Sequence, residues 1–471
     1  MTIAFLLNGE RIEVADAAPS MTVLDFLRTR ERLTGTKEGC AEGDCGACTI
    51  AIGRQESGAA RWQVANSCIL LLSQIDGTEV KTVEGLAGPS GLHSVQTVLA
   101  ESDGTQCGFC TPGIVMSLYA LTHGRADDGS VSDRDIHEAL AGNLCRCTGY
   151  RPIVDAARAL CTAPGMAEPE RVPPVANSRI AGQGELHLVP QTLSELVALR
   201  TAYPTATLIA GATDLGLIPA KKRRGFPLAI STRRVAELKR MAWEGDVLVL
   251  GAAVTYADAL TEVESAFPAF GALIRRIGSR QIRTMGTFGG NIGTASPVGD
   301  TLPVLLALDA EVDLAGQTGL RRMRVVDFLT GYRQTALAAD EVIAAVRLPR
   351  LAEGETLFAW KLSRRFDQDI STLLGAFRVR VEGGRLADLA AAFGGMAERA
   401  KRAPALEALL TCAPWTDVPP VGIEAALAAD FAPLSDHRAS AAYRRAAAAN
   451  LVRRLHIATT HPGVPLELEA L

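Results

Sequence analysis

Alternating and helical spacings of hydrophobic residues divide the beginning of the chain into short elements. Residues 3–14 form two strand-like runs around the dipeptide Asn8-Gly9, which is typical of hairpin turns because both residues tolerate positive φ. The apolar positions of residues 23–27 have helical spacing, and residues 49–53 and 62–72 are typical of further strands. The first part of the chain therefore predicts a small β-rich unit.

From about residue 95 the hydrophobic spacing changes to the helical period. Short helices with one apolar face bury that face against each other. We therefore expect a bundle of four helices here. Its predicted members are residues 94–102, 111–123, 132–142 and 150–160.

After Cys161 the sequence is rich in Pro, Gly and Ala and has no periodicity, which predicts an interdomain linker. Strand and helix patterns then alternate as far as a break near Pro349. A last block contains a hairpin-like region, 373–395, and an Ala- and Arg-rich surface helix, 440–454. These patterns predict an α+β multidomain protein. The expected boundaries are 1–78, 79–162, a linker at 163–184, 185–350 and 351–471.

The composition changes this picture little but excludes some functions. The chain has 471 residues, 48% of them hydrophobic, and Lys+Arg 48 against Asp+Glu 52 give a net charge of −4. This balance argues against a general binder of nucleic acid or of anionic membranes. The apolar runs are shorter than the ~20 residues of a membrane span, and the first residues lack the features of a signal peptide. We therefore expect a cytoplasmic protein, in which clustered cysteines indicate metal binding more than disulfides.

Eight of the ten cysteines lie between residues 40 and 147, in two sets. The first set is Cys40, Cys45, Cys48 and Cys68, three thiols on one loop and one from afar, which is the plant-ferredoxin spacing of a [2Fe–2S] cluster. Gly39, Gly43 and Gly46 allow this loop to fold tightly and to aim backbone N–H groups at sulfur. Structural zinc is the alternative, although zinc sites favour paired two-ligand knuckles.

The second set is Cys107, Cys110, Cys145 and Cys147. This spacing is less specific, because two pairs of cysteines also suit zinc. Each pair lies at the edge of an expected helix, so that facing helix ends could close around one cluster. The remaining two, Cys161 and Cys412, have no companions and are interpreted as buried apolar thiols.

Two segments rich in small residues, 207–216 and 287–300, could bind a pyrophosphate through backbone N–H groups. Taken singly, each is as typical of an ordinary strand-turn. The chain contains neither a GxGxxG motif nor a Walker A motif. The basic run 221–224 is interpreted as a solvated loop, and the seven histidines share no ligand spacing.

The motifs CAEGDCGACT, QCGFCTPG and GNLCRCTGYRPI together resemble the iron–sulfur part of the molybdenum hydroxylases, the family of xanthine dehydrogenase, aldehyde oxidoreductases and carbon monoxide dehydrogenase. The resemblance implies a ferredoxin-like β-grasp domain at 1–78 that binds one [2Fe–2S] cluster. It also implies that the helical bundle, 79–162, binds a second [2Fe–2S] cluster, nearer to the molybdenum.

The two glycine-bearing segments resemble the FAD domain of the same family, which implies a two-part α+β FAD-binding domain at 185–350 and an α+β C-terminal flavoprotein domain at 351–471. The pyrophosphate would lie on the turns at 211–213 and 289–291, with Lys361 favouring negative charge on reduced flavin. Ala212 departs from the Gly or Asn common at its position. The implied FAD-binding residues are Thr207, Leu208, Ile209, Ala210, Gly211, Ala212, Thr213, Asp214, Ile277, Thr287, Phe288, Gly289, Gly290, Asn291, Asp300, Ile343 and Lys361, of which Ile277 and Ile343 would form apolar walls.

Residues 361–371 resemble the region that admits NAD in the xanthine dehydrogenases, with Asp367 or Asp369 near the nicotinamide. The alternative is a charged surface turn beside a strand. The order of the modules is similar to that of xanthine dehydrogenase, and implies the small iron–sulfur/FAD subunit of a two-subunit bacterial enzyme. On this interpretation a larger partner subunit binds the molybdopterin cofactor and hydroxylates hypoxanthine or xanthine, and the complex is a dimer of heterodimers.

The same resemblance implies that electrons reach FAD through the second and then the first cluster, and leave with NAD. Three alternatives remain at this point. The chain could serve another molybdenum hydroxylase that acts on an N-heterocycle or an aldehyde. It could also be a freestanding iron–sulfur flavoprotein electron carrier, or a zinc-stabilised scaffold.

Overall fold

The structure is a computed structural model that describes residues 2–56, 59–89, 91–123, 131–162, 173–416 and 420–466. Its internal contacts divide the chain into two compact units. The first unit comprises Met1–Thr192, Thr205–Arg234 and Gly278–Gly286; the second comprises Leu193–Pro204, Val235–Ile277 and Thr287–Leu471.

The first unit begins with a five-stranded sheet of order β2-β1-β5-β3-β4, in which β1 pairs with β5 in parallel. Helix α1 buries its apolar residues in the core beneath this sheet, and Thr22 caps it by accepting from the Asp25 amide. The hairpin prediction is confirmed, with φ of 53° at Asn8 and 89° at Gly9. The elements are β1 Ile3–Leu7, β2 Glu10–Val14, α1 Val23–Thr29, β3 Thr49–Glu56, β4 Ala59–Asn66 and β5 Glu79–Lys81, with 3₁₀ turns at Leu72–Gln74 and Val83–Gly85.

One predicted strand was wrong in extent. The strand expected over 62–72 ends at Asn66. Ser67 turns the chain there, because its amide and its hydroxyl both donate to the carbonyl of Cys48, at 3.3 and 2.7 Å. This turn places Cys68 beside the cysteine loop. A strand that continued beyond Asn66 could not place it there.

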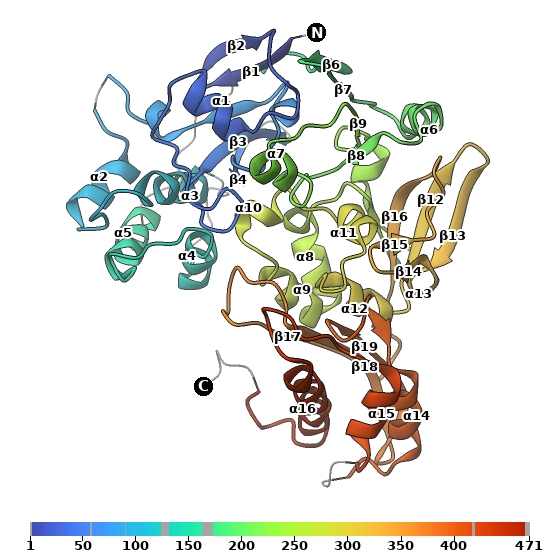
Figure 1. Ribbon diagram of the computed structural model, residues 1–471. Coiled ribbons are helices and arrows are strands. Elements are labelled where there is room, and N and C mark those ends of the chain that lie inside the picture. Colours follow the sequence, from blue (N-terminus) through green and yellow to red (C-terminus); the bar gives the residue numbers. More distant parts are fainter. Residues whose placement is uncertain are drawn as a thin grey trace. The chain divides into compact units, whose positions relative to one another are not determined.

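The four predicted helices are present, as α2 Ser94–Glu101, α3 Thr111–His123, α4 Asp133–Leu140 and α5 Arg151–Cys161 (Figure 1). They share one apolar core, in which α3 is buried along most of its length. Ser132 caps α4 by accepting from the Asp135 amide, and Pro152 lies in the first turn of α5. Helix α3 also packs against β3, so that the bundle and the sheet form a continuous structure.

A four-stranded sheet of order β6-β7-β9-β8 completes the first unit. Strand β6 lies inside the segment that was expected to be a linker, so that expectation was wrong for its residues; 163–172 lie outside the described residues. Asn177 ties this segment down by donating its amide to Asp76 at 2.6 Å. The elements are β6 Arg179–Gly182, β7 Glu185–Leu188, β8 Thr207–Ile209, α7 Leu217–Lys222, β9 Leu228–Ser231 and α10 Arg280–Arg283.

The second unit contains an antiparallel sheet of order β10-β11-β16-β12-β13. Helices pack on it around a core rich in Phe and Leu. The elements are α6 Leu193–Ala202, a 3₁₀ turn at Glu237–Lys239, β10 Met241–Glu244, β11 Val247–Gly251, α8 Tyr256–Ala266, α9 Pro268–Arg275, α11 Phe288–Thr294, α12 Thr301–Ala307, β12 Glu311–Gly316, β13 Gly319–Arg324, α13 Val325–Phe328, β14 Leu329–Gly331, β15 Gln334–Thr335 and β16 Val342–Pro349.

The end of the second unit is a sheet of order β17-β18-β19-β20 covered by three helices. The hairpin expected over 373–395 is β18 and β19. The helix expected over 440–454 extends from Ala441 to Thr460, and it is not only a surface helix, because one face lies in the core. The elements are β17 Glu355–Leu362, β18 Leu373–Glu382, β19 Arg385–Gly394, β20 Lys401–Arg402, α14 Pro404–Cys412, α15 Ile423–Asp430 and α16 Ala441–Thr460.

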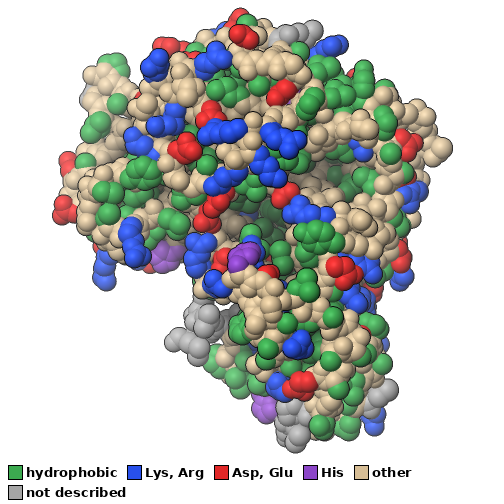
Figure 2. Space-filling model, in the orientation of Figure 1, with side chains coloured by type: hydrophobic (Ala, Val, Ile, Leu, Met, Phe, Trp, Pro, Cys, Tyr) green, Lys and Arg blue, Asp and Glu red, His purple; other side chains and the backbone are tan. Residues whose placement is uncertain are grey.

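These elements confirm the predicted α+β multidomain fold class. On the face shown in Figure 2, basic and acidic side chains are interspersed among apolar and neutral ones. Among the described helices, none has the length and apolar character needed to cross a membrane.

Candidate cofactor sites

The loop between α1 and β3 directs backbone N–H groups at sulfur. The amides of Glu42, Asp44 and Cys45 all donate to Sγ of Cys40, at 3.4, 3.3 and 3.3 Å. The Cys40 amide donates in turn to Sγ of Cys45 at 3.3 Å. Positive φ values at Gly43 and Gly46 allow the loop to close in this way. Hydrogen bonds of this kind stabilise a thiolate, and so suit a thiol that ligates metal.

The four thiols of this first site are in contact: Cys40 lies beside both Cys45 and Cys68, and Cys68 also lies beside Cys48. Hydrogen bonding from the thiols of Cys45 and Cys68 lowers the pKa of Cys40, and the thiol of Cys68 likewise lowers the pKa of Cys48. Cys48 and Cys68 are buried, whereas Cys40 and Cys45 are half-buried. Within the described residues, no three His, Cys, Asp or Glu side chains are grouped to hold one metal ion. Instead of a single ion, the four thiols and the amides that donate to them fit the donor set of a cluster that contains two irons.

The second site also has four neighbouring thiols, but it is more exposed. A hydrogen bond from the Phe109 amide and the nearby thiol of Cys147 lower the pKa of Cys107, and both of these cysteines are exposed. Burial and the neighbouring Cys145 raise the pKa of Cys110 to about 12. These contacts pair Cys107 with Cys147 and Cys110 with Cys145, again a four-thiol donor set that fits a [2Fe–2S] cluster.

Tyr150 orders the loop that carries the second half of this site. Its hydroxyl accepts from the Cys145 amide at 2.7 Å and donates to the carbonyl of Asn143 at 3.1 Å. Its φ of 68° lies in the left-handed region, and it is the N-cap residue directly before α5. The hydroxyl of Thr148 also lies 3.2 Å from Sγ of Cys145. The loop is therefore held by side chains of the motif itself.

The two cysteine loops contact each other directly. The Leu144 amide donates to the carbonyl of Cys45 at 2.9 Å. The Asn143 side chain donates to the carbonyl of Gly46 at 3.0 Å, and a Cβ on Gly46 would lie only 1.9 Å from the carbonyl oxygen of Gly142. The two sites are thus joined backbone to backbone, at a separation that only glycine allows.

A buried polar network surrounds this junction. Gln281 of α10 directs its side-chain N–H₂ towards the hydroxyls of Thr49 and Ser117, at 3.1 and 3.3 Å. Ser117 donates to the side chain of Asn143 at 2.6 Å. Sequence reasoning missed Asn143 and Gln281, although Asn143 lies within one of the cysteine motifs and could have been found there.

In the first unit, the predicted pyrophosphate segment is β8 followed by a tight turn. A Cβ on Gly211 would lie 1.7 Å from the carbonyl oxygen of Met285, so this position requires glycine. Ala212 adopts a φ of 59°, which explains why Gly or Asn is favoured at its position. The side chain of Gln74 donates to the carbonyl of Ala210 at 3.2 Å. Because position 211 has no side chain, only the backbone of this turn is available to a ligand there.

In the second unit, the predicted segment 287–291 begins α11. Thr287 caps this helix by accepting from the Gly290 amide at 3.0 Å. A Cβ on Gly289 would lie 2.5 Å from Cβ of Ala252, so the helix packs there without a side chain. Phe288 is fully buried against Tyr256, and the side chain of Asn291 accepts from the hydroxyl of Thr301.

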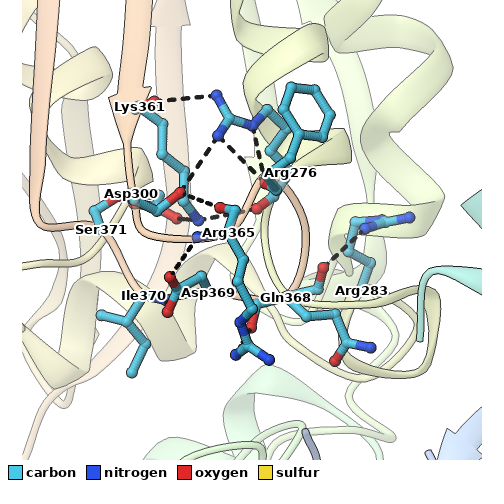
Figure 3. A network of polar contacts seen from close by, with 12 residues as sticks. Arg276, Arg283, Asp300, Lys361, Arg365, Gln368, Asp369, Ile370 and Ser371 are labelled. Carbon is cyan, nitrogen blue, oxygen red and sulfur yellow. Dashed lines mark hydrogen bonds and ion pairs between the residues drawn. The ribbon is translucent and has the colours of Figure 1, made fainter. Parts of the chain in front are cut away.

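Lys361 and Asp300 form a buried ion pair in the second unit (Figure 3). The ammonium lies 2.7 Å from the Asp300 carboxylate and 2.9 Å from the carbonyl of Arg276, and its side chain is only 1% exposed. Ser371 donates its hydroxyl to the other oxygen of Asp300. Two of the three donors of Lys361 are thus assigned, and one N–H remains for a ligand.

Arg276 holds the segment that follows β17 (Figure 3). Its guanidinium donates to the carbonyls of Lys361 and Phe366, at 3.1 and 3.3 Å, and stacks on the Phe366 ring at 4.4 Å. Asp369 accepts from the amides of Arg364 and Arg365, at 2.9 and 3.0 Å, and so closes the loop. Sequence reasoning did not identify Arg276, although it directly precedes Ile277.

The other residues singled out from the sequence take these positions. Ile277 and Ile343 are half-buried and pack against the core of the second unit. Cys161 is half-buried rather than buried, at the edge of the helical core, and nothing is described of the Cys412 side chain. The basic run 221–224 is not only a solvated loop: it includes the end of α7, and Lys221 contacts the first cysteine loop.

Four family descriptions match successive parts of the chain. They are a 2Fe-2S iron-sulfur cluster binding domain over 5–73, a [2Fe-2S] binding domain over 82–158, an FAD binding domain in molybdopterin dehydrogenase over 183–351, and a CO dehydrogenase flavoprotein C-terminal domain over 358–459. The first two contain the two cysteine sets, and the third contains both glycine-bearing segments.

Similar proteins include several xanthine dehydrogenases. Xanthine dehydrogenase of Emericella nidulans is 32% identical over 91% of this chain and 36% of the relative, and that of Drosophila subobscura is 34% identical over 88% and 36%. Xanthine dehydrogenase/oxidase of Mus musculus is 32% identical over 84% of this chain and 34% of the relative. The chain thus spans about a third of the length of these curated relatives.

Solved structures of carbon monoxide dehydrogenase chains are also similar to this chain. A carbon monoxide dehydrogenase chain from Hydrogenophaga pseudoflava is 30% identical, with a TM-score of 0.53, over 57% of this chain and 94% of that chain. One from Oligotropha carboxidovorans is 26% identical, with a TM-score of 0.53, over 58% and 96%. The chain therefore belongs to the molybdenum hydroxylase family, of which it carries two [2Fe–2S] domains, the FAD-binding domain and the flavoprotein C-terminal domain.

Proposed function

We propose that this chain is the electron-transfer subunit of a xanthine dehydrogenase. It takes electrons from the molybdopterin cofactor of a larger partner subunit during the oxidation of hypoxanthine or xanthine, and delivers them to NAD. The observation that carries this proposal is the junction of the two cysteine loops, through the bond between the Leu144 amide and the carbonyl of Cys45. Two four-thiol sites joined in this way form a short relay, and the relatives that match most of the chain are xanthine dehydrogenases.

The chain's own residues have distinct tasks in this proposal. The cysteines 40, 45, 48 and 68 would hold one cluster, and 107, 110, 145 and 147 the other. The buried position of Cys48 and Cys68 excludes water from that side of the first site. The backbone of 207–214 and 287–291, with Asp300 and Lys361, would hold FAD. When bound, the clusters transfer single electrons and the flavin converts between single electrons and hydride.

The surface around the second site supports the proposal that a partner subunit binds there. Cys107 and Cys147 are exposed, and so are the neighbouring apolar side chains of Phe109 and Leu144, at 48% and 42%. Apolar side chains gathered around exposed metal ligands are typical of a surface that another protein covers. We assign this face to the molybdopterin-binding subunit, in a cytoplasmic dimer of heterodimers as the family resemblance implies.

A second candidate is the small subunit of another molybdenum hydroxylase. The likeness to a carbon monoxide dehydrogenase chain, at 30% identity, favours this alternative. The two candidates differ in the substrate of the partner and in the electron acceptor, and not in the roles of the residues above.

The test is to purify the native complex and to count iron, flavin and molybdenum. Two [2Fe–2S] clusters predict about four irons and one FAD per chain, with molybdenum present only when a larger polypeptide accompanies it. The complex should reduce NAD when xanthine is added. Reduction driven by another substrate alone would support the second candidate, and zinc in place of iron would overturn both.

A Cys107→Ser variant should lose iron, because it removes one of four thiolates. Cys161→Ser is the matched control, since Cys161 is a half-buried thiol of the same helical domain and belongs to neither set. Equal iron loss in the two variants would contradict the assignment of Cys107.

A further inference from the structure

Helix α7 covers the buried half of the first cysteine site. Its residues Leu217 and Ala220 pack in one apolar cluster with Cys48 and Cys68. Just before the helix, a Cβ on Gly216 would lie 2.0 Å from the carbonyl oxygen of Ile69, so the backbones approach closely there. The helix is thus packed onto the site by its apolar face.

The last turn of the same helix reaches the other half of the site. Lys221 donates from Nζ to the carbonyl of Cys40 at 2.5 Å, and its ammonium lies 3.2 Å from the Glu42 carboxylate. Cys40 and Glu42 belong to the loop whose amides point at sulfur. Lys222, the next residue, is exposed on the same turn. One short helix therefore contacts both halves of the first cysteine site.

The charge of Lys221 has an electrostatic consequence. Two irons held by four thiolates and bridged by sulfides have a net negative charge, and the uptake of an electron increases it. A positive charge nearby favours the more negative state, whereas a carboxylate opposes it. The Lys221 and Glu42 side chains are 45% and 50% exposed, so salt should screen both effects.

We propose that Lys221 is a positioning residue of the first [2Fe–2S] site, which fixes the Cys40 loop and raises the reduction potential of that cluster. Glu42 acts in the opposite direction and limits this effect. Lys221 lies on α7, which follows the proposed flavin segment 207–216 along the chain. This inference rests on the cluster assignment in the proposed function.

The test is a redox titration of the full-length protein with dithionite, followed by electron paramagnetic resonance. The signal of the first cluster is assigned as the one that Cys45→Ser changes. Lys221→Met should shift its midpoint potential to a more negative value, whereas Lys221→Arg, which keeps the charge, should leave it near that of the wild type. Glu42→Gln should shift the midpoint to a more positive value. Lys222→Met is the control on the same turn and should cause no shift.

The shifts of Lys221→Met and Glu42→Gln should both shrink at about 1 M salt, where the screening length falls to about 3 Å. A wild-type protein without any cluster signal would overturn the proposed function together with this inference. A normal signal with the same midpoint in Lys221→Met would overturn this inference alone. An equal negative shift in Lys221→Arg and Lys221→Met would also overturn it, because the charge would then have no role.

Discussion

At the scale of single residues, burial determines the charge of His187 on β7. Its side chain is almost fully buried, with Nδ1 2.9 Å from the hydroxyl of Ser73. Nε2 lies 3.8 Å from Glu185, but that carboxylate already accepts from the amide and hydroxyl of Ser20. Desolvation outweighs a hydrogen bond with the Phe226 backbone, which acts in the opposite direction, and lowers the pKa of His187 from 6.5 to about 4.

This pKa predicts a loss of stability in mild acid. Between pH 6.5 and about pH 4 the unfolded chain binds a proton at this position that the folded chain does not. The free energy of unfolding therefore decreases as the pH is lowered through this window. The contribution of His187 amounts to about 3 kcal/mol at most, and does not change further below the folded pKa. Urea denaturation at a series of pH values measures it. His187→Gln should show a shallower pH dependence, and identical slopes in the two proteins would contradict the prediction.

At the scale of elements, the turn at Gly46 determines how closely the two cysteine loops approach. Its φ of 68° is left-handed, and any Cβ would meet the Gly142 carbonyl at 1.9 Å and the Asn143 side chain at 2.8 Å. The position therefore excludes larger residues for two reasons, the backbone conformation and the lack of space.

Gly46→Ala should accordingly separate the loops and lower the iron content of the purified protein. Gly184→Ala is the matched control, because Gly184 has a φ of 81° but open space around it. Both variants should lose about 1–2 kcal/mol of stability from the left-handed conformation. Only Gly46→Ala has the additional clash, and iron analysis compares the two. Full iron occupancy in Gly46→Ala would show that the loops do not need this approach.

At the scale of the whole molecule, the eight cysteines of the two sites belong to the first unit alone. They join segments that are far apart in the sequence, from Cys40 to Cys147. Metal binding at such sites contributes directly to the free energy of folding, because no preformed site exists in the unfolded chain.

Removal of iron with a chelator should therefore loosen the first unit selectively. Hydrogen exchange should become faster in the loops at 39–48, 107–110 and 143–150, while the sheet of β17–β20 in the second unit keeps its protection. Mass spectrometry of the iron-loaded and iron-free proteins makes the comparison. A uniform change over both units, or none in the cysteine loops, would contradict this assignment of the metal to the first unit.

Much of this organisation was predictable because its signals are local. The hairpin at Asn8 and Gly9 and the four helices of the bundle follow from turn chemistry and from hydrophobic period, which depend on neighbouring residues only. The cysteine motifs are equally local, since three cysteines of the first site lie within nine residues, 40–48. The sequence by itself therefore determined the fold class, both cysteine sets and the family.

Contacts between distant segments were decided only by the tertiary structure. The strand expected over 62–72 ends at Asn66, because Ser67 bonds to the carbonyl of Cys48, and β6 forms in the expected linker by pairing with β7. The Lys361–Asp300 pair and the reach of Lys221 to Cys40 likewise join residues separated by 61 and 181 positions. No local pattern encodes such pairings, since they depend on how the packed elements bring their side chains together.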